Sequence, residues 1–415
     1  MARETYVTGI DVGSSAVRVA VAQAAAKEND RTPTILGTAR VPMEGMQKGV
    51  ISDVEAAAHS ISKALDIAER VAGVPIEHAY VSINGSHILS QNSRGVIAVS
   101  RADGEITSDD VTRVINAAQA ISLPSNREIL HVLPQNFIVD GQEHIQDPVG
   151  MTGVRLEVET HIIEGSAPFI KNITKAVNQA GVHVEDFVFA PLAASAAVLD
   201  KRQRELGVVL VDMGAGTTSL VVHEDNILLH TAVLPLGSSH ITNDLAIGLR
   251  TSIEVAEAVK LEHGTALVDE VQENEEIVIE GDRDTEQEII MRREVAAIIR
   301  ARLDEIFSFV DRELKSINRS GLLPAGVIFT GGGAKLPGIT EVAKKRLRLP
   351  ARLGRTKNVE GYGEQIDDTD FGVVLGLTIK AIEQEGRGAS RTHVNMPDIG
   401  NTVHKIRGWL KSFMP

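Results

Sequence analysis

The sequence predicts an α/β fold with two related lobes, and three stretches carry this prediction. Residues 7–21 and 208–222 share one pattern: an apolar strand that runs into an Asp, a turn rich in Gly, Ser or Thr, and a second apolar strand. Residues 325–347 read as strand, Gly-rich turn and helix. Because the two similar stretches lie about 200 residues apart, they indicate paired lobes and not a solenoid, whose period is far shorter.

Composition narrows the class of protein. A chain of 415 residues with 43% hydrophobic residues is expected to form about two to four folded domains. The net charge is −14, and residues 402–415 contribute three positive charges, so the remainder carries −17. This acidic body argues against nucleic acid as a ligand, because no basic surface is evident to displace counterions. The absence of cysteine excludes disulfides, thiolate catalysis and Cys-ligated zinc, and suits a reducing cytosol.

Neither a secretory signal nor a membrane-spanning segment is expected. The first ten residues carry charge and lack the apolar core of a signal peptide. The longest apolar stretch, 187–199, is too short to span a bilayer and contains Pro191. The protein is therefore expected to be soluble, or to reach a membrane only through a surface element.

The first lobe is predicted to begin with strands and one helix. Residues 1–42 read as three strands split by a Gly-Ser-Ser turn. Residues 52–74 place apolar side chains at helical spacing, with Ser52 as the candidate N-cap and Gly73 as the stop. Another strand is expected at 78–85.

The pattern changes between residues 86 and 161. Short strands surround one helix at 107–121, with Pro and Gly between them, which predicts a small α+β insertion. Helix–strand alternation then resumes, with a helix at 167–181, a strand at 183–190 and a helix at 192–203.

The second half of the chain adds an acidic segment and an irregular one. Residues 269–288 hold ten acids and one Arg, which indicates a solvated hairpin, with a surface for a basic partner as the alternative. A long helix is expected at 294–317. Residues 384–401 are rich in Gly, Ser, Pro and Asn without periodicity, and they read as a flexible linker.

Two Gly-rich turns offer groups that could hold phosphate. In the turn from Asp11 to Ser15, backbone N–H groups and the hydroxyls of Ser14 and Ser15 could donate to an anion, while Asp11 could orient water on Mg²⁺. The turn from Asp212 to Thr218 supplies the same groups again. Two such turns could grip a polyphosphate from both sides, although each alone is also compatible with a plain hairpin.

Two weaker signals accompany these turns. Gly331, Gly332 and Gly333 could let a base or a phosphate lie against the backbone, or they could form a close strand–helix packing turn. Glu257 and Lys260 share one helix face, where an exposed salt bridge is the ordinary explanation. The sequence contains no H-E-x-x-H motif, no histidine ligand spacing and no G-x-S-x-G elbow.

The chain resembles the actin/Hsp70/sugar-kinase ATPase superfamily in four ordered motifs: "GIDVGSSAVRVAV", "VVLVDMGAGTTSLVV", "GVIFTGGGAKLPGI" and the late "DFGVVLGL". The match covers most of residues 6–382. The insertion and the basic C-terminal tail on a linker resemble the FtsA family, bacterial actin homologues that polymerise and tether the tubulin-like FtsZ ring to the membrane. The resemblance implies a two-lobed actin-like ATPase fold built from ribonuclease-H-like repeats.

The resemblance also assigns roles to residues, with ATP and Mg²⁺ as the cofactors. It implies that Asp11 and Asp212 organise Mg²⁺, which the nucleotide phosphates hold without a protein cage. The other expected nucleotide-binding residues form two phosphate loops, the adenosine motif and a helix that reaches ribose and adenine: Gly13, Ser14, Ser15, Gly214, Gly216, Thr217, Thr218, Gly331, Gly332, Gly333, Glu257 and Lys260.

One position departs from the hydrolytic members of the superfamily. Relatives place Gln or Glu near Pro191 to orient the attacking water, and here that position holds Ala190. Positioning the water is a substantial share of phosphoryl-transfer catalysis. We therefore expect ATP binding with slow hydrolysis at most.

The resemblance divides the chain into subdomains. The expected division is 1–85 with 162–203 as the first-lobe core, 86–161 as the insertion, 204–236 with 301–383 as the second-lobe core, 237–300 as a small subdomain, 384–401 as a linker and 402–415 as an amphipathic helix. The small subdomain is expected to bind the FtsZ C-terminal peptide. The insertion is expected to contact other membrane division proteins.

The tail, 402–415, is predicted to lie in a membrane interface as an amphipathic helix. At 100° per residue its apolar side chains gather on one face with basic side chains at the edges, which suits anionic headgroups. Docking of this helix on the protein's own body is the alternative. The expected membrane-binding residues are Val403, Ile406, Arg407, Trp409, Leu410, Lys411, Phe413 and Met414.

The expected function is that of an ATP-binding, actin-like protein that self-associates into filaments on the cytoplasmic face of the bacterial membrane, at the division septum, and anchors the FtsZ ring. One rival is a pilus-assembly ATPase of the same fold, which borrows its membrane attachment from partners. The other is a sugar or metabolite kinase, which needs a catalytic Asp base and a polar substrate pocket that the sequence does not clearly show.

Overall fold

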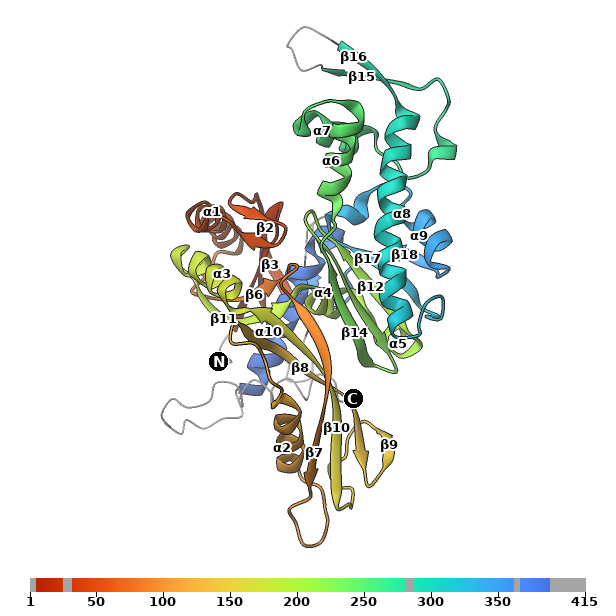
Figure 1. Ribbon diagram of the computed structural model, residues 1–415. Coiled ribbons are helices and arrows are strands. Elements are labelled where there is room, and N and C mark those ends of the chain that lie inside the picture. Colours follow the sequence, from red (N-terminus) through yellow and green to blue (C-terminus); the bar gives the residue numbers. More distant parts are fainter. Residues whose placement is uncertain (1–4, 25–31, 281–286, 362–365, 389–415) are drawn as a thin grey trace.

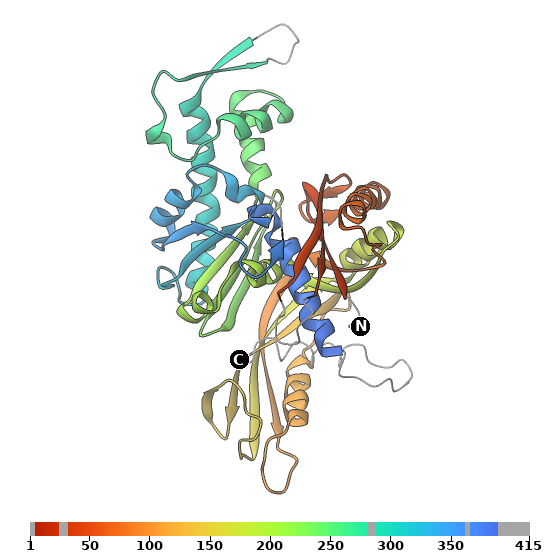
Figure 2. The ribbon, with the colours of Figure 1, turned by 180° about the vertical axis from the view of Figure 1, so that it is seen from behind.

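The computed structural model describes residues 5–24, 32–280, 287–361 and 366–388. Two lobes lie side by side, with a subdomain extending below the first lobe and a hairpin extending above the second (Figure 1). Seen from behind, the helix α10 (Gly372–Gly388) runs between the lobes (Figure 2).

The first lobe is built on a six-stranded sheet with the order β11-β6-β1-β2-β3-β19. Strands β1 to β3 form the antiparallel meander predicted from the sequence, and β6 runs parallel to β1. Helices α1 and α3 pack together beside this sheet, and α10 packs on β1, β2 and β6. The bounds are β1 Tyr6–Val12, β2 Ala16–Gln23, β3 Thr34–Pro42, β4 Met46–Gln47, β5 Val50–Ile51, α1 Val54–Ala72, β6 His78–Ile83, α3 Ala167–Gln179, β11 His183–Phe189 and β19 Glu360–Gly361.

Helix α1 shows how local sequence sets an element. Its N-cap is Asp53, whose carboxylate accepts from the backbone N–H groups of Glu55 and Ala56, and not the predicted Ser52. The helix ends at Gly73, which adopts the left-handed conformation (φ 73°) that favours glycine. The predicted stop is therefore confirmed, and the N-cap is shifted by one residue.

The insertion forms a separate α+β unit with its own small core. Its four-stranded antiparallel sheet has the order β7-β10-β8-β9, and α2 packs on β7 and β10. A capping box between Thr107 and Asp110 starts α2. The bounds are β7 Leu89–Ala98, α2 Ser108–Gln119, β8 Arg127–Val139, β9 Gln142–Ile145 and β10 Arg155–Ser166.

The second lobe repeats the plan of the first around a five-stranded sheet of order β14-β13-β12-β17-β18. Strands β12 and β13 form an antiparallel hairpin and β17 runs parallel to β12, as β6 does to β1. This confirms the prediction of two related lobes. The bounds are β12 Val208–Met213, β13 Thr218–Glu224, β14 Ile227–Leu234, α6 Ser238–Leu249, α7 Ile253–His263, β15 Glu276–Glu280, β16 Gln287–Met291, α8 Arg292–Ser316, β17 Gly326–Thr330, α9 Ile339–Leu347 and β18 Ala351–Leu353.

Two predicted elements differ from the observed ones. The helix expected at 192–203 is two helices, α4 (Ala190–Val198) and α5 (Lys201–Leu206), because Asp200 caps a new helix through a capping box with Gln203. Helix α10 reaches Gly388, so the first residues of the linker expected at 384–401 are helical. Glu and Gln at the start of that segment are good helix formers, which explains the extension.

Candidate functional site

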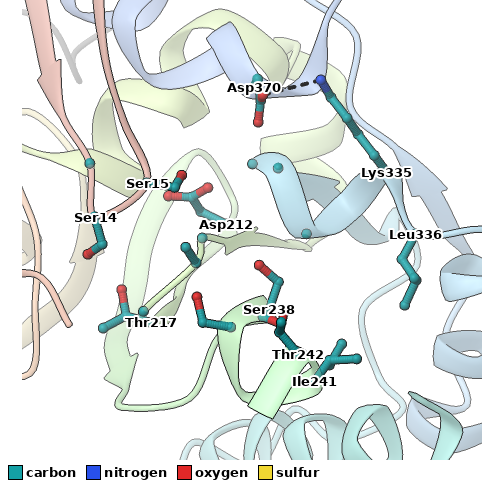
Figure 3. Close-up of a pocket in the computed structure, with 18 of the residues that line it drawn as sticks. Ser14, Ser15, Asp212, Thr217, Ser238, Ile241, Thr242, Lys335, Leu336 and Asp370 are labelled. Atoms are coloured by element: carbon teal, nitrogen blue, oxygen red, sulfur yellow. Dashed lines mark hydrogen bonds and ion pairs between the residues drawn. The ribbon is translucent and has the colours of Figure 1, made fainter. Parts of the chain in front are cut away.

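A cleft of about 870 Å³ opens between the two lobes. This volume lies in the range of cofactor pockets, roughly 300–1,000 Å³. The first lobe contributes the turn between β1 and β2. The second lobe contributes the turn between β12 and β13, the residues after β17, and parts of α6 and α7. Polar side chains from these segments face the cleft in Figure 3.

Hydrogen bonds within and around it hold the turn between β1 and β2. Gly13 N donates to Ala16 O (3.2 Å) and closes the hairpin, while the Ser14 hydroxyl accepts from Gly49 N (2.9 Å). A Cβ at position 13 would lie 3.0 Å from Ala16 O, so glycine keeps the turn tight. Ser15 is exposed, and Gly13, Ser14 and Ser15 all line the cleft.

The turn between β12 and β13 has the same geometry. Gly214 N donates to Thr217 O (2.9 Å), which closes this hairpin in the same way. A Cβ at Gly216 would lie 2.7 Å from Lys48 Cα and 3.1 Å from Ser14 Oγ. The two lobes therefore meet at this point, and Gly214, Gly216 and Thr217 line the cleft.

Thr218 is the one predicted nucleotide-binding residue that does not line the cleft. It is the first residue of β13, it is fully buried, and its hydroxyl has no hydrogen-bond partner within the described part of the chain. Successive residues of a strand point to opposite faces, so a Thr217 that faces the cleft turns Thr218 away. The Thr-Thr motif alone could not separate the two.

The residues after β17 bring bare backbone against the acidic part of the cleft. Gly331 has φ 84°, and a Cβ there would lie 2.5 Å from Asp212 Oδ1. A Cβ at Gly332 would lie 2.8 Å from Asp370 Oδ1, and one at Gly333 would lie 2.6 Å from the side chain of Met213. All three glycines line the cleft, so a side chain at any of them would displace a neighbour.

Helices α6 and α7 form a polar wall. Lys260 Nζ donates to Thr242 Oγ1 (2.8 Å) and to Glu257 Oε2 (2.5 Å), and the Thr242 hydroxyl donates to the same carboxylate oxygen (2.5 Å). Lys260 is 8% exposed, whereas the Glu257 side chain is 43% exposed. A fully exposed salt bridge is therefore not what the structure contains, because the lysine is buried in the cleft wall.

The two predicted acids are buried at the bottom of the cleft. The Ser82 hydroxyl donates to Asp11 Oδ1 (2.7 Å), and Arg18 Nη1 lies 3.5 Å from Asp11 Oδ2. Burial raises the pKa of Asp11, although Arg18 and Ser82 oppose the rise. Burial and the neighbouring carboxylates of Asp11 and Asp370 raise the pKa of Asp212 to about 7. The ionised acids repel each other, and a bound cation would relieve that repulsion.

The sequence did not predict a network of ion pairs around Asp370. Arg18 Nη2 lies 3.2 Å from Asp370 Oδ2, and Lys335 Nζ lies 3.2 Å from the same oxygen and 2.7 Å from Asp368 Oδ2 (Figure 3 draws Asp370 with Lys335). Burial alone would raise the pKa of Asp370, but Arg18 and Lys335 hold it below its usual range. Arg18 belongs to the first lobe and Lys335 to the second, so the network joins them. An Arg inside the otherwise apolar strand "AVRVAV" is the signal that could have revealed it.

The site's donors suit Mg²⁺ that arrives with a polyphosphate. Two buried carboxylates could hold the water ligands of the ion, and the glycine turns leave room for phosphate oxygens near backbone N–H groups. Within the described ranges, no group of three His, Cys, Asp or Glu side chains could hold a metal ion. Ala190 lines the cleft and is 2% exposed, and its methyl group cannot orient water.

The predicted membrane-binding residues, from Val403 to Met414, lie outside the described residues. In the part of the chain that the structure describes, no helix is long and apolar enough to cross a membrane.

Two family models match the chain: "SHS2 domain inserted in FTSA" at residues 85–164 and "Cell division protein FtsA" at residues 209–376. Proteins named Cell division protein FtsA are similar over most of the chain. The Borreliella burgdorferi protein is 38% identical over 407 residues (97% of each chain). The Bacillus subtilis protein is 42% identical over 352 residues (84% of this chain, 78% of that one). The Escherichia coli K12 protein is 30% identical over 413 residues (98% and 97%).

Solved structures share the fold at low identity. The PilM-PilN type IV pilus biogenesis complex matches with a TM-score of 0.67 and 17% identity, over 91% of this chain and 98% of that one. MreB 5 of Spiroplasma citri bound to AMPPNP matches with a TM-score of 0.55 and 13% identity, over 94% and 99%.

The paired lobes, the cleft between them and these structural neighbours define an actin-like ATPase fold, which confirms the predicted fold class. Within that fold, the chain belongs to the FtsA family of cell-division proteins. It is thus an actin-like division protein with the family's inserted subdomain. The pilus-assembly alternative is not favoured, since that structure is 17% identical and the FtsA relatives are 30–42% identical. The kinase alternative is not favoured either.

Proposed function

We propose that the interlobe cleft binds ATP with Mg²⁺, and that closure of the lobes on the nucleotide favours contacts between copies of the chain in a filament. The observation that carries this proposal is the pair of hairpin turns, closed by equivalent bonds from Gly13 and Gly214, that meet across the cleft. A fold neighbour, MreB 5 of Spiroplasma citri, was solved with AMPPNP, which supports a nucleotide of this class.

Each group in the cleft then has a defined task. Backbone N–H groups of the two turns, with the hydroxyls of Ser14, Ser15 and Thr217, donate to phosphate oxygens. Bound Mg²⁺ would neutralise phosphate charge. Asp11 and Asp212 would accept hydrogen bonds from the ion's water ligands. Beyond them, Glu257 and Lys260 would face the ribose and adenine, and the glycines after β17 would lie beside the base.

Titration with a fluorescent ATP analogue tests this proposal directly. Saturable, Mg²⁺-dependent binding that excess ATP displaces is the expected result. A protein that binds no nucleotide under these conditions would refute it. A parallel screen for phosphorylation of small hydroxyl compounds should stay negative, since a positive result would favour the kinase alternative.

Nucleotide affinity should depend on pH through Asp212. Because the pKa of this carboxyl is about 7 in the nucleotide-free protein, it must lose its proton before it can hold Mg²⁺ ligands. We expect the affinity for Mg-ATP to fall by about tenfold between pH 8 and pH 6, with protons released on binding. Calorimetric titrations in two buffers of different ionisation enthalpy measure that release, and binding without proton release would contradict the expectation.

ATP hydrolysis should be slow. Ala190 occupies the cleft position from which a Gln or Glu could orient the attacking water. Even GTPases that have such a Gln, but act without a partner's arginine finger, hydrolyse nucleotide at about 0.01 s⁻¹ or less. Phosphate release by the purified protein, followed with a coupled assay, is expected to stay at or below that order. A rate near the enzyme median of about 10 s⁻¹ would be inconsistent with this role of Ala190.

We further propose that residues 402–415 hold the protein on the cytoplasmic face of the membrane. The three basic residues of this segment supply about 1 kcal/mol each at an anionic surface, and the apolar face adds a comparable term. One short helix would bind reversibly, whereas a filament that carries many would bind firmly through avidity. The residues proposed to enter the interface are Val403, Ile406, Arg407, Trp409, Leu410, Lys411, Phe413 and Met414.

Deletion of residues 403–415 should move the protein from the membrane fraction to the cytosol. Flotation with anionic vesicles measures this in the purified protein, and neutral vesicles serve as the matched control. Equal flotation of the full and shortened chains would mean that another surface attaches the protein.

The small subdomain and the insertion are the two parts of the protein that we expect to bind partners. We propose that the small subdomain, 237–300, binds the C-terminal peptide of FtsZ and that the insertion contacts other membrane division proteins at the septum. The hairpin in the small subdomain supports the first assignment: Val278 and Ile289 pair directly across it and are 58% and 62% exposed. An exposed apolar pair on a hairpin is suited to the apolar side chains of a short peptide.

A further inference from the structure

The insertion touches the second lobe as well as the lobe that carries it. Strands β7, β8 and β10 of the insertion lie beside β14, the edge strand of the second-lobe sheet (Figure 1). Ser90 Oγ donates to Thr231 O (2.9 Å), and the amide of Gln146 lies 3.4 Å from Asp225 O. An edge strand exposes unpaired backbone groups, and here the side chains of the insertion cover part of that edge.

A bulge in β14 forms the centre of this contact. His230 pairs with Val222 and Leu228 pairs with His223, so Leu229 is an extra residue without a partner on β13. The amide nitrogen of Gln135, on β8, donates to Leu228 O (2.7 Å) and to Leu229 O (3.0 Å). One amide has two N–H groups, which match the two carbonyls that the bulge turns toward the insertion.

A buried histidine lies at the other end of the contact. His161 on β10 is 2% exposed, with Nδ1 2.7 Å from Asn92 Oδ1 and Nε2 2.9 Å from Thr231 Oγ1. Burial and the nearby His230 lower the pKa of His161 to about 3, so the ring is neutral. The Asn92 oxygen can only accept, so Nδ1 donates to it and Nε2 accepts from the Thr231 hydroxyl.

The chemistry of this contact allows it to open. The bonds join polar side chains of the insertion to backbone carbonyls and to one hydroxyl of β14. Each such bond adds only about 0.5–1.5 kcal/mol net, because water replaces it on separation. The insertion is covalently continuous only with the first lobe, so any rotation of one lobe against the other must shear or break the contact.

We propose that the insertion acts as an interlobe latch, in which Gln135, Ser90 and His161 hold the bulged edge of β14 and restrain relative rotation of the two lobes. Because of this latch, rotation of one lobe against the other changes the contacts of the insertion. In the same way, a partner bound to the insertion changes the geometry of the cleft between the lobes. The second part rests on the proposed nucleotide function, whereas the first part does not require a nucleotide.

Spin-label distances test the latch in the nucleotide-free protein. The chain has no cysteine, so Cys introduced at Val154 on the insertion and Leu322 on the second lobe, which are 74% and 64% exposed, take the labels specifically. Gln135→Leu keeps the side-chain size and removes both bonds to the bulge. Gln142→Leu is the matched control, because Gln142 is exposed on the insertion and no bond to β14 is found for it among the described residues.

We expect a single narrow distance distribution in the parent and in Gln142→Leu, and a broadened or shifted one in Gln135→Leu. Gln135→Leu should also change the dissociation rate of the ATP analogue by about three- to tenfold, the effect of one or two such bonds. Identical distance distributions in all three proteins, or equal broadening in the control, would overturn the latch. Altered distances in a protein that binds no nucleotide would keep the latch and refute the proposed nucleotide function instead.

Discussion

Replacing Asp212 with Asn is expected to stabilise the nucleotide-free protein above pH 7 and, at the same time, to weaken Mg-ATP binding by about 10- to 100-fold. The stabilising effect follows from the pKa. The carboxyl titrates near 3.8 in the unfolded chain and at about 7 in the folded one, so the folded state holds its proton more tightly. The free energy of unfolding therefore falls as pH rises between these values, and Asn removes the buried charge that causes the fall.

The loss of affinity follows from the same buried charge. A charged group that accepts a hydrogen bond contributes about 1.5–3 kcal/mol, which corresponds to the stated range. Thermal unfolding at pH 8 and pH 4 and nucleotide titration at pH 8 measure both effects. Asp66→Asn is the matched control, because Asp66 is exposed on α1 and does not line the cleft. A variant that is less stable than the parent at pH 8, or that binds nucleotide normally, would contradict the role given to Asp212.

Replacing Gly376 with Ala should destabilise the whole protein by about 3 kcal/mol or more. A Cβ at this position would overlap the carbonyl oxygen of Ala193, so α10 and α4 would have to separate. Every residue of α4 is buried, and this helix contacts strands of both lobes as well as α10. The substitution would therefore disturb packing in the cores of both lobes, and not only between α4 and α10.

Gly248→Ala provides the control for this effect. It also places a methyl group inside a helix, but there the nearest atom is the flexible end of Ile298, which can move away. We expect Gly248→Ala to unfold within a degree or two of the parent, because a gain in helix propensity offsets the contact. Equal unfolding temperatures for Gly376→Ala and the parent would show that the α4–α10 pair can separate without cost.

The sequence was sufficient to predict the two lobes because each repeats a hairpin with an Asp before a Gly-rich turn. Periodicity cannot show which of two adjacent threonines faces the cleft, so Thr218 was predicted to bind and is buried behind Thr217. Asp370 lies far along the chain from Arg18, and only the fold brings their side chains to 3.2 Å. Likewise, the bonds from Gln135 to the bulge in β14 depend on how the insertion is placed against the other lobe. Long-range contacts of this kind leave no local pattern.

The expectation that ATP hydrolysis is slow rests on one residue, and the sequence alone could identify it. Ala190 was expected at the position of the water-orienting residue, and it does line the cleft. Its methyl group fits a protein that uses nucleotide to hold a conformation and not to turn over rapidly.

Electron microscopy of the protein on anionic lipid monolayers tests the central claim most directly. The full chain is expected to form filaments on the lipid with Mg-ATP and to form few without nucleotide. The chain that lacks residues 403–415 should leave the lipid bare, and Asp212→Asn should need far more nucleotide. Filaments that form equally well without nucleotide, or lipid that is coated equally by the shortened chain, would contradict a nucleotide-dependent scaffold tethered by its tail.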